Sequence, residues 1–244
     1  MDTPQPTAGE MQARVLHRDG LMLVIDKPAG IAVHKGPKGG PNLEASFDAL
    51  RYGLPRPPVL AHRLDRDTSG CLVLGRHRKA TASLGLLFKH GKIGKTYWAV
   101  VEGGPAENEG EIDIPLGRLD ETRGWWQKPD PNGLPSQSRW SVMGRGDGLT
   151  WLALEPVTGR THQLRVHCAA MGFPIVGDNI YGNGPRFGEP SLHLHSREIV
   201  VPLSKNKPPV RVVAPVPLHL HERLRACGWN GEDVHAPEQV ASHA

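Results

Sequence analysis

A strongly charged loop next to an apolar segment is the feature that most constrains how this chain can fold. The loop reads HRLDRDTSG over residues 62–70, and apolar residues precede it at 58–61 and follow it at 71–74. Because the segment after the loop has the composition of a buried strand, the loop must lie at the edge of a core. Charges that pair with one another at the surface would account for an ordinary loop. Here carboxylates, guanidinium groups and hydroxyls are packed so densely beside a buried strand that we predict a functional site.

The whole chain has the composition of a globular protein with a slight excess of positive charge. Of its 244 residues, 38% are hydrophobic and 22% are charged, and the net charge is +4. This excess weakly favours an anionic partner such as a nucleic acid. The N-terminus lacks the apolar core of a signal peptide, and no apolar run approaches the ~20 residues that span a bilayer. We therefore expect a cytoplasmic protein with no membrane partner. The three cysteines match no metal or redox spacing and are expected to be reduced thiols: Cys71, Cys168 and Cys227.

Short runs of β-forming residues outnumber helical patterns along the chain. Strands are predicted at 21–25, 70–74, 96–101, 139–143, 150–154, 192–201 and 210–213, and another begins near 112–114. Helices are predicted at 43–50, 79–89, 159–171 and 217–226, and residues 118–135 read as a long surface loop. We predict an α+β fold with a mixed, mostly antiparallel central sheet and flanking helices and loops. One domain is expected over 14–226, with a flexible N-terminal tail at 1–13 and a C-terminal tail at 227–244.

The charged loop permits two enzymatic interpretations, and the first concerns four of its residues. Asp65-Arg66-Asp67-Thr68 matches the D-x-D-x-T signature of haloacid-dehalogenase-like phosphatases. In that family the first aspartate attacks phosphorus, and the motif caps a continuous apolar strand. Here the residues directly before Asp65 are His62-Arg63-Leu64, and no other segment supplies the rest of a Mg²⁺ site. Four-residue matches of this kind are common, so the phosphatase is the second choice.

The second interpretation uses the whole loop, because H-R-L-D-x-x-T-S-G resembles the signature of RluA-type RNA pseudouridine synthases. Three further segments resemble elements of that family in the same order. They are residues 23–34 (V-x-x-K-P-x-G-x-x-x-H), 95–97 (K-x-Y) and 159–182 (G-R-T-H-Q-L-R-x-H, then G-D-x-x-Y-G). The resemblance covers roughly residues 14–220. An ordered set of motifs is far more specific than any one of them, and the chain is identified as a member of this family.

The resemblance implies an isomerase that converts a uridine of RNA into pseudouridine. The C–N glycosidic bond breaks, the uracil turns and rejoins the ribose through carbon, so neither a cofactor nor a metal is expected. Asp65 matches the catalytic carboxylate, which acts as nucleophile or as base toward the ribose. Burial alone would protonate it, and the resemblance assigns Arg165 as the cation that holds its charge. Tyr97 matches the ring that stacks on the uracil, with a hydroxyl that could assist proton removal from C5.

The resemblance also implies contacts with RNA, which is the expected partner as a tRNA or rRNA stem-loop. A base inside folded RNA must be flipped out before it can react, and Arg63 matches the residue that fills the resulting gap. Asp67, Thr68 and Ser69 are expected to fix the loop through side-chain-to-backbone bonds. No obligate protein partner is evident. The remaining predicted RNA-binding residues are His62, which also belongs to the loop scaffold, and Arg160, Thr161, His162, Gln163 and Leu164.

Two alternatives and one departure from the family complete the prediction. His193 and His195 share one strand face, a spacing that can bind Zn²⁺, but no third ligand is apparent and we predict no metal site. A non-catalytic RNA-binding domain of the same fold should have lost Asp65, Tyr97 or Arg165, and all three are present. Many relatives carry an N-terminal S4 module. Only about twenty residues precede the first predicted strand here, so RNA recognition is expected from the catalytic domain and its loops, including residues 125–126.

Overall fold

The computed structural model describes residues 4–36, 39–120, 122, 125–204 and 206–232. Its helices are α1 (Ala8–Ala13), α2 (Arg78–Lys89), α3 (Gln163–Ala170) and α4 (Leu218–Ala226), with a 3-10 helix η1 (Leu43–Leu50). Its strands are β1 (Val15–Arg18), β2 (Met22–Lys27), β3 (Val59–Leu60), β4 (Ser69–Gly75), β5 (Gly94–Glu102), β6 (Glu109–Asp113), β7 (Leu116–Arg118), β8 (Gln127–Pro129), β9 (Gln137–Gly146), β10 (Leu149–Pro156), β11 (Leu194–Val201) and β12 (Val210–Val213).

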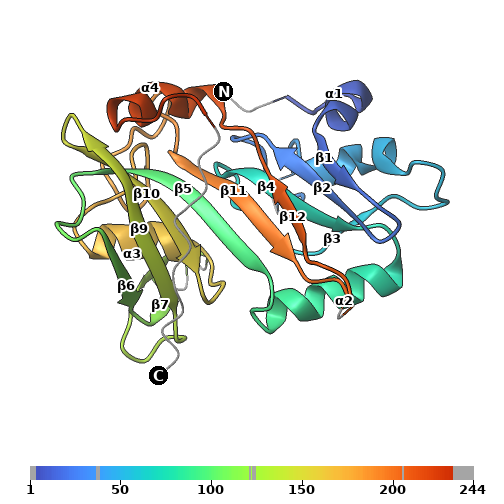
Figure 1. Cartoon of the computed structure of the whole chain (residues 1–244), viewed down its shortest axis with the longest axis horizontal. Coiled ribbons are helices and arrows are strands. Elements are labelled where there is room, and N and C mark those ends of the chain that lie inside the picture. Colours follow the sequence, from blue (N-terminus) through green and yellow to red (C-terminus); the bar gives the residue numbers. More distant parts are fainter. Residues whose placement is uncertain (1–3, 37–38, 121, 123–124, 205, 233–244) are drawn as a thin grey trace.

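Ten of these strands form one sheet that crosses the molecule (Figure 1). The order along the sheet is β1-β2-β4-β11-β5-β10-β9-β6, and β3 and β12 pair with β4 and β11. Among the described strands, β4 and β11 form the one parallel pair, and the other neighbours are antiparallel. The predicted fold class, α+β with a mixed and mostly antiparallel sheet, is confirmed. No helix in the described part of the chain is long and apolar enough to cross a membrane.

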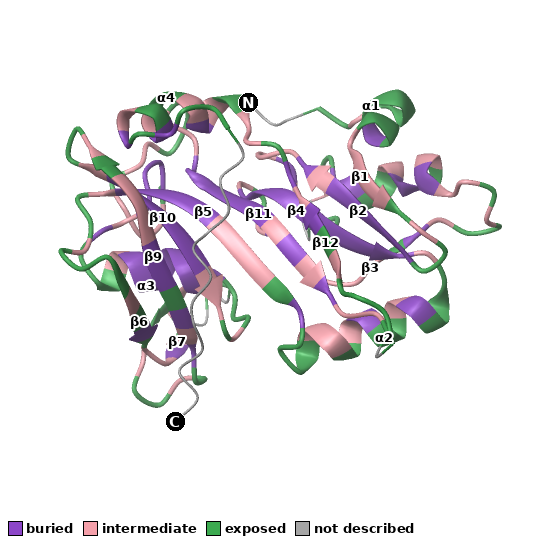
Figure 2. Cartoon of the chain, in the orientation of Figure 1, coloured by how far each residue is buried: buried purple, intermediate pink, exposed green. Residues whose placement is uncertain are grey.

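The sheet is buried on both faces, because side chains alternate between its two sides along each strand. In one half of the sheet, residues of β2 and β4 point alternately toward η1 and α1 on one side and toward α2 and β12 on the other. In the other half, residues of β5 and β10 alternate in the same way between clusters that include α3 and α4. Figure 2 shows the resulting buried strands at the centre of the molecule. Two helical layers and a continuous sheet therefore form the scaffold.

Tyr97 of β5 lies at the junction of the two halves. It packs against the cluster that contains α3 and also against the cluster that contains η1. Both clusters lie on the same face of the sheet, so the side chain marks a position where the two halves meet. A half-buried tyrosine at such a junction has one side held by the core and the other available to a cavity.

Three segments differ from the sequence-based expectation. Residues 8–13 form α1 instead of a flexible tail. A capping box between Thr7 and Glu10 starts the helix, and Met11 is fully buried. At the other end, Cys227 and Trp229 pack against α4, so the domain extends past residue 226, and 233–244 lie outside the described residues. The predicted loop at 118–135 contains β8, which pairs with β7 as a small separate sheet.

The buried Met11 gives a direct test of the N-terminal helix. Replacing Met11 by Ala should reduce the free energy of unfolding by ~2–4 kcal/mol, because it leaves a cavity against β2 and η1. Urea unfolding followed by circular dichroism measures this change. Ala13→Ser alters an exposed position of the same helix and should change stability by no more than ~0.5 kcal/mol. Equal stability of the two variants would show that α1 does not pack as described.

Candidate active site

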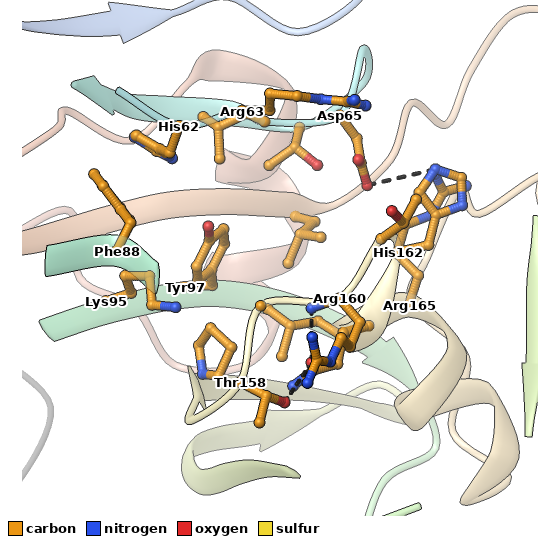
Figure 3. Close-up of a pocket in the computed structure, with 18 of the residues that line it drawn as sticks. His62, Arg63, Asp65, Phe88, Lys95, Tyr97, Thr158, Arg160, His162 and Arg165 are labelled. Atoms are coloured by element: carbon orange, nitrogen blue, oxygen red, sulfur yellow. Dashed lines mark hydrogen bonds and ion pairs between the residues drawn. The ribbon is translucent and has the colours of Figure 1, made fainter. Parts of the chain in front are cut away.

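A cavity of about 480 Å³ opens where three separate segments meet (Figure 3). The first segment is the charged loop before β4, the second is the start of β5, and the third is the turn from β10 into α3. The predicted site residues all line this cavity: His62, Arg63, Asp65, Tyr97, Arg160, Thr161, His162, Gln163, Leu164 and Arg165. Sequence positions about one hundred residues apart are thus brought to one place by the sheet order.

The loop that carries Asp65 is fixed from below by Lys27, the last residue of β2. The Lys27 side chain is fully buried, and its Nζ donates hydrogen bonds of 2.8 Å to the carbonyl oxygens of Pro28, Arg66 and Thr68. Burial lowers the pKa of Lys27 to about 7. Three carbonyl acceptors match the three donors of an ammonium group, and they favour the charged form. Lys27 was quoted above as part of the K-P motif, but its role in holding the loop was missed.

The end of the loop enters β4 through a close backbone contact. Gly70 has a φ of 104°, and a Cβ there would lie 2.2 Å from the carbonyl oxygen of Ser196 on β11. Only glycine fits a backbone that is both left-handed and this close to its parallel neighbour. The hydroxyl of Ser69 hydrogen-bonds Nδ1 of His195 at 2.9 Å. The loop therefore ends at a fixed point between β2 and β11.

The side chains expected to fix the loop do so only in part. Ser69 contacts a histidine ring as described, whereas Asp67 lies 3.9 Å from Arg66 in an exposed ion pair. Thr68 accepts a bond from Lys27 through its carbonyl, and its buried hydroxyl has no hydrogen-bond partner in the described structure. The expected side-chain-to-backbone bond is therefore wrong for Thr68, and the bond of Ser69 goes to a side chain. Hydrogen bonds from Lys27 to the backbone carbonyls of Arg66 and Thr68 hold the loop instead.

The position of the D-x-D-x-T match argues against the phosphatase interpretation. Asp65 lies in the connection between β3 and β4, two strands that pair antiparallel to each other. The motif therefore precedes its long strand, β4, instead of following the C-terminal end of a continuous apolar strand. The one strand before it, β3, has two residues. This geometry removes the structural context that the phosphatase signature requires.

Asp65 faces the ring of His162 across the cavity (Figure 3). Its Oδ2 lies 3.7 Å from Nε2 of His162, and the carboxylate is about one quarter exposed. Burial lowers the pKa of His162, although the charge of Asp65 opposes this shift. The other ring nitrogen, Nδ1, lies 2.8 Å from the hydroxyl of Tyr181, which accepts a bond from the backbone of Gln127. The neutral ring is best satisfied when Tyr181 donates to Nδ1 and Nε2–H faces Asp65.

The backbone at His162 is strained in a way that places the ring. His162 has a φ of 54°, in the left-handed region that is uncommon for a residue with a side chain. It directly precedes α3, which has no side-chain cap, and the Gln163 side chain fixes the preceding turn by accepting bonds from the Arg160 amide and the Thr158 hydroxyl. Gln163 also donates to the Gln137 carbonyl and to Ser138. Its amide is fully used in folding the turn, which makes it a positioning residue in this structure.

Arg165, the cation assigned to Asp65, has its direct hydrogen bonds with another carboxylate. Its Nε and Nη2 donate instead to the two carboxylate oxygens of Asp178, at 2.8 and 2.7 Å, and both side chains are buried. Asp178 also accepts from the amides of Ile180 and Tyr181. The sequence pattern does not reveal the turn at 177–181, which places a carboxylate thirteen residues away against α3. Arg165 still lines the cavity, and its charge and that of Asp65 attract each other at longer range.

Tyr97 projects from β5 into the cavity below the loop (Figure 3). Burial is the main cause that raises the pKa of its hydroxyl, and the nearby charge of Asp65 adds to the shift, while a hydrogen bond with Ser196 opposes it. The phenol is therefore neutral at pH 7. A neutral ring in an apolar setting is suited to stacking against a base. It is a weak proton acceptor, so the stacking role gains support over the proton role.

The remaining predicted residues divide between the wall and the rim of the cavity. His62 stacks on Phe88 with ring centroids 4.2 Å apart, and its Nε2 accepts a bond from the Val73 amide. Leu164 belongs to the buried core and presents an apolar edge to the cavity. Exposed residues form the rim: Arg63, Arg160 and Thr161. Wall residues thus shape the cavity, and rim residues are available to a ligand.

The cavity has a strongly positive lining. The only carboxylate among the described residues of this lining is that of Asp65. The lining also contains five cationic residues: Arg63, Lys89, Lys95, Arg160 and Arg165. Burial lowers the pKa of Lys95, which stands beside Tyr97 at the start of β5. Such a lining attracts a polyanion, and several of these side chains can bond phosphate oxygens. Chemically, the site combines one anionic group with neutral rings and a basic rim.

The histidines considered as zinc ligands have other partners. His193 Nδ1 lies 2.7 Å from the Ser191 carbonyl, and His195 lies between Ser69 and the Ala214 carbonyl. Burial lowers the pKa of His193 to about 4 and that of His195 to about 3. The described residues contain no cluster of three histidine, cysteine, aspartate or glutamate side chains that could hold a metal ion. These two rings serve the packing around β11.

Comparison with known proteins agrees with this geometry. The family model described as RNA pseudouridylate synthase matches residues 21–170, which include the loop, β5 and all of α3. An uncharacterized RNA pseudouridine synthase of Zymomonas mobilis is 42% identical over 84% of this chain and 94% of its own length. The chain therefore belongs to the RNA pseudouridine synthase family and is an isomerase that acts on RNA.

Further relatives place it within that family. The ribosomal large subunit pseudouridine synthase C of Vibrio cholerae is 34% identical over 88% of this chain and 69% of its own length. The solved structure of human RNA pseudouridylate synthase domain containing 4 superposes with a TM-score of 0.75. It is 26% identical and covers 89% of this chain and 95% of its own. The RluA-type resemblance is thereby confirmed.

The buried histidines predict acid sensitivity of the fold. Burial also lowers the pKa of His62 to about 3, so His62, His193 and His195 stay neutral in the folded state at pH 5. The unfolded chain protonates them below about pH 6.5, so stability is lost as the pH falls from 7 to 5, by up to about 1.4 kcal/mol per pH unit for each ring. Burial raises the pKa of Asp26 to about 6. This carboxyl therefore binds a proton more readily in the folded state, which offsets part of the stability lost on acidification.

Urea midpoints at pH 7 and pH 5 measure this dependence. The midpoint should be lower at pH 5. His62→Gln keeps an acceptor for the Val73 amide and should weaken the dependence, whereas the exposed control His90→Gln should leave it unchanged. A midpoint that rises on acidification would contradict neutral buried rings.

The Arg165–Asp178 pair gives a second test. Asp178→Asn preserves the shape of the side chain but leaves the buried guanidinium without its counterion, and it should cost ~3–5 kcal/mol of unfolding free energy. Asp48→Asn breaks an exposed ion pair with Arg51 and should cost less than ~1 kcal/mol. Chemical denaturation of both variants compares the two pairs directly. A similar small loss for each would mean that Arg165 has another counterion.

Proposed function

We propose that the chain isomerises a specific uridine in a tRNA or rRNA stem-loop, with Asp65 as the catalytic carboxylate acting on a flipped-out nucleotide. One observation carries the proposal: Asp65 and Tyr97 meet in one cavity whose rim is basic. A flipped uridine needs a carboxylate beside its ribose, a ring against its base and cations for its phosphates. The three requirements are met by residues from the loop, from β5 and from the turn before α3.

Asp65 promotes cleavage of the glycosidic bond, either as a nucleophile that attacks the ribose or as a base that acts on the ribose. In either case the C1′–N1 bond breaks, the uracil turns, C1′ bonds to C5, and the proton lost from C5 is balanced by one gained at N1. The Nε2 edge of His162 faces Asp65 from 3.7 Å and gives the carboxylate a polar neighbour on that side of the cavity. Arg165 supports the same charge at longer range while paired with Asp178. Asp65 is then the single anionic reactant in the cavity.

Tyr97 stacks on the detached uracil and keeps it in the cavity while it turns. The backbone of Tyr97 pairs with Leu154 of β10 and Ser196 of β11, and its side chain packs against two core clusters, so the ring is supported before the base arrives. A preformed stacking surface lowers the entropy cost of holding a base that has lost its covalent link. The neutral hydroxyl adds no charge that would repel Asp65.

RNA recognition uses the exposed groups around the cavity. Arg63 is exposed next to Asp65 and fills the gap that the flipped base leaves in the RNA, because its planar guanidinium can stack on bases and bond phosphates. Trp125 is 58% exposed and packs edge-on against His162 with centroids 5.4 Å apart. It therefore offers a second aromatic surface close to Asp65, which supports a role of residues 125–126 in RNA recognition.

Replacing Asp65 by Asn tests the catalytic assignment. The substitution keeps the size of the side chain and removes its charge, so it should abolish isomerisation, by at least ~10³-fold, and leave RNA affinity nearly intact. Pseudouridine mapping of total RNA with and without the gene first identifies the target uridine. Single-turnover assays on that stem-loop then compare wild type and variant.

The exposed control Asp48→Asn should match the wild type in the same assays, because Asp48 lies on η1 away from the cavity. Near-wild-type turnover of Asp65→Asn would remove Asp65 from catalysis. A gene deletion that changes no pseudouridine in tRNA or rRNA would contradict the proposed substrates.

A further inference from the structure

A second cavity of about 490 Å³ lies on the other side of the Asp65 loop. Asp65 lines the first cavity, whereas the next two residues, Arg66 and Asp67, line the second, and Arg165 lines both. Three consecutive residues span at most about 10 Å, so the two cavities are close neighbours across one loop. A short run of unpaired RNA can bridge such a distance.

The second cavity presents an aromatic ring that the catalytic role does not use. Phe187 is 77% exposed, far more than any other phenylalanine, tyrosine or tryptophan that stands among the large exposed hydrophobic residues. The guanidinium of Arg186 lies over this ring, with Cζ 5.4 Å from its centroid. An exposed ring and a neighbouring arginine form the kind of surface on which single-stranded bases stack. Folding stability alone does not favour so exposed a ring.

The charges around the second cavity are arranged to accept a phosphate. Two carboxylates lie there, but each already has partners. Asp67 stands 3.9 Å from Arg66, and Glu189 accepts bonds from the amide and the hydroxyl of Ser191. Arg186 and the exposed amide of Asn179 complete the polar lining. Arginine suits phosphate, and an amide side chain offers both a donor and an acceptor to a base edge.

The segment that carries Phe187 is anchored on the catalytic scaffold. Asp178 binds Arg165 and the amides of Ile180 and Tyr181, and its own carbonyl accepts from the Gly184 amide. A Cβ on Gly184 would lie 2.4 Å from the backbone of Gly177, so the two ends of this turn are in direct contact. The base of the segment is therefore held by the ion pair of Arg165, the residue that lines both cavities.

We propose that this second cavity is an accessory nucleotide subsite, in which an unpaired base close in sequence to the target uridine stacks on Phe187 while Arg186 contacts its phosphate. The inference rests on the proposed function, since it places a second nucleotide of the same RNA next to the reacting one. The subsite gives the enzyme a way to select a uridine by its neighbour.

Kinetics on the stem-loop identified by pseudouridine mapping test the subsite. Phe187→Ala should lower kcat/KM by about 10-fold, mainly through KM, which is the scale of losing one base–aromatic stack. Phe187→Tyr keeps a ring and should restore most of the activity. Leu218→Ala removes an equally exposed apolar side chain on α4 and should have no effect. A Phe187→Ala variant that behaves like Leu218→Ala overturns the proposal.

Substrates with an abasic nucleotide at each position flanking the uridine locate the occupant. At one position, removing the base should slow the wild type by about the same factor as Phe187→Ala, and the two losses should not add. Losses that add at every flanking position would show that Phe187 contacts no neighbouring base. A failure of the proposed function would give a different result, namely no turnover by the wild type itself. That result would also overturn the subsite.

Discussion

The buried ion pair between Arg165 and Asp178 is the interaction on which the site depends. A buried guanidinium is tolerated only where its charge and its donors are matched, and here two parallel hydrogen bonds do both. The same carboxylate binds the amides that start the turn at 177–181. That turn places the Tyr181 hydroxyl against His162, and the ring of His162 against Asp65. Removing the pair would therefore affect Asp65 through three successive contacts.

A second constraint is the set of hydrogen bonds from a buried lysine to the backbone of the loop that carries Asp65. The backbone carbonyls of the loop at 65–68 have few strand or helix partners, and buried carbonyls require donors. Lys27 supplies three donors from one buried side chain and joins residues on both sides of Asp67. Asp65 is thus held between a lysine-bound loop and a histidine ring, two rigid supports from different halves of the sheet.

Much of the fold could be predicted because its signals are local. Alternating and continuous apolar runs indicated most strands. Asparagine is a common N-cap residue, and Asn42 caps η1. Gly172 follows the end of α3 in a left-handed conformation, as is typical of glycine there. Helix α1 escaped prediction because one buried residue, Met11, secures a segment that is otherwise polar. The strand pair of β7 and β8 was missed since its residues carry little periodicity and include proline and glycine.

The ordered motifs predicted which residues form the site, but not the hydrogen bonds and ion pairs among them. Motifs specify which residues meet, whereas the partner of a buried charge depends on turns whose geometry has no period in the sequence. Asp178 was visible as the aspartate of a G-D-x-x-Y-G segment, and Lys27 as the lysine of a K-P segment. Both are charged residues next to glycine or proline turns in a region with apolar neighbours. A charge in that setting must be paired or hydrogen-bonded if it is buried, and that rule is the signal that could have identified them.

The distribution of charge in the cavity separates binding from chemistry. Groups that meet solvent, such as Arg63, Arg160 and Lys89, are cationic and suit the phosphates of a long polyanion. Deeper in the cavity, burial keeps Tyr97 and His162 neutral, so they can contact a base and a carboxylate without adding charge. An additional cation beside Asp65 would form a tight ion pair and weaken it as a nucleophile or base. Because its guanidinium bonds Asp178, Arg165 contributes a positive field at Asp65 without bonding the Asp65 carboxylate oxygens.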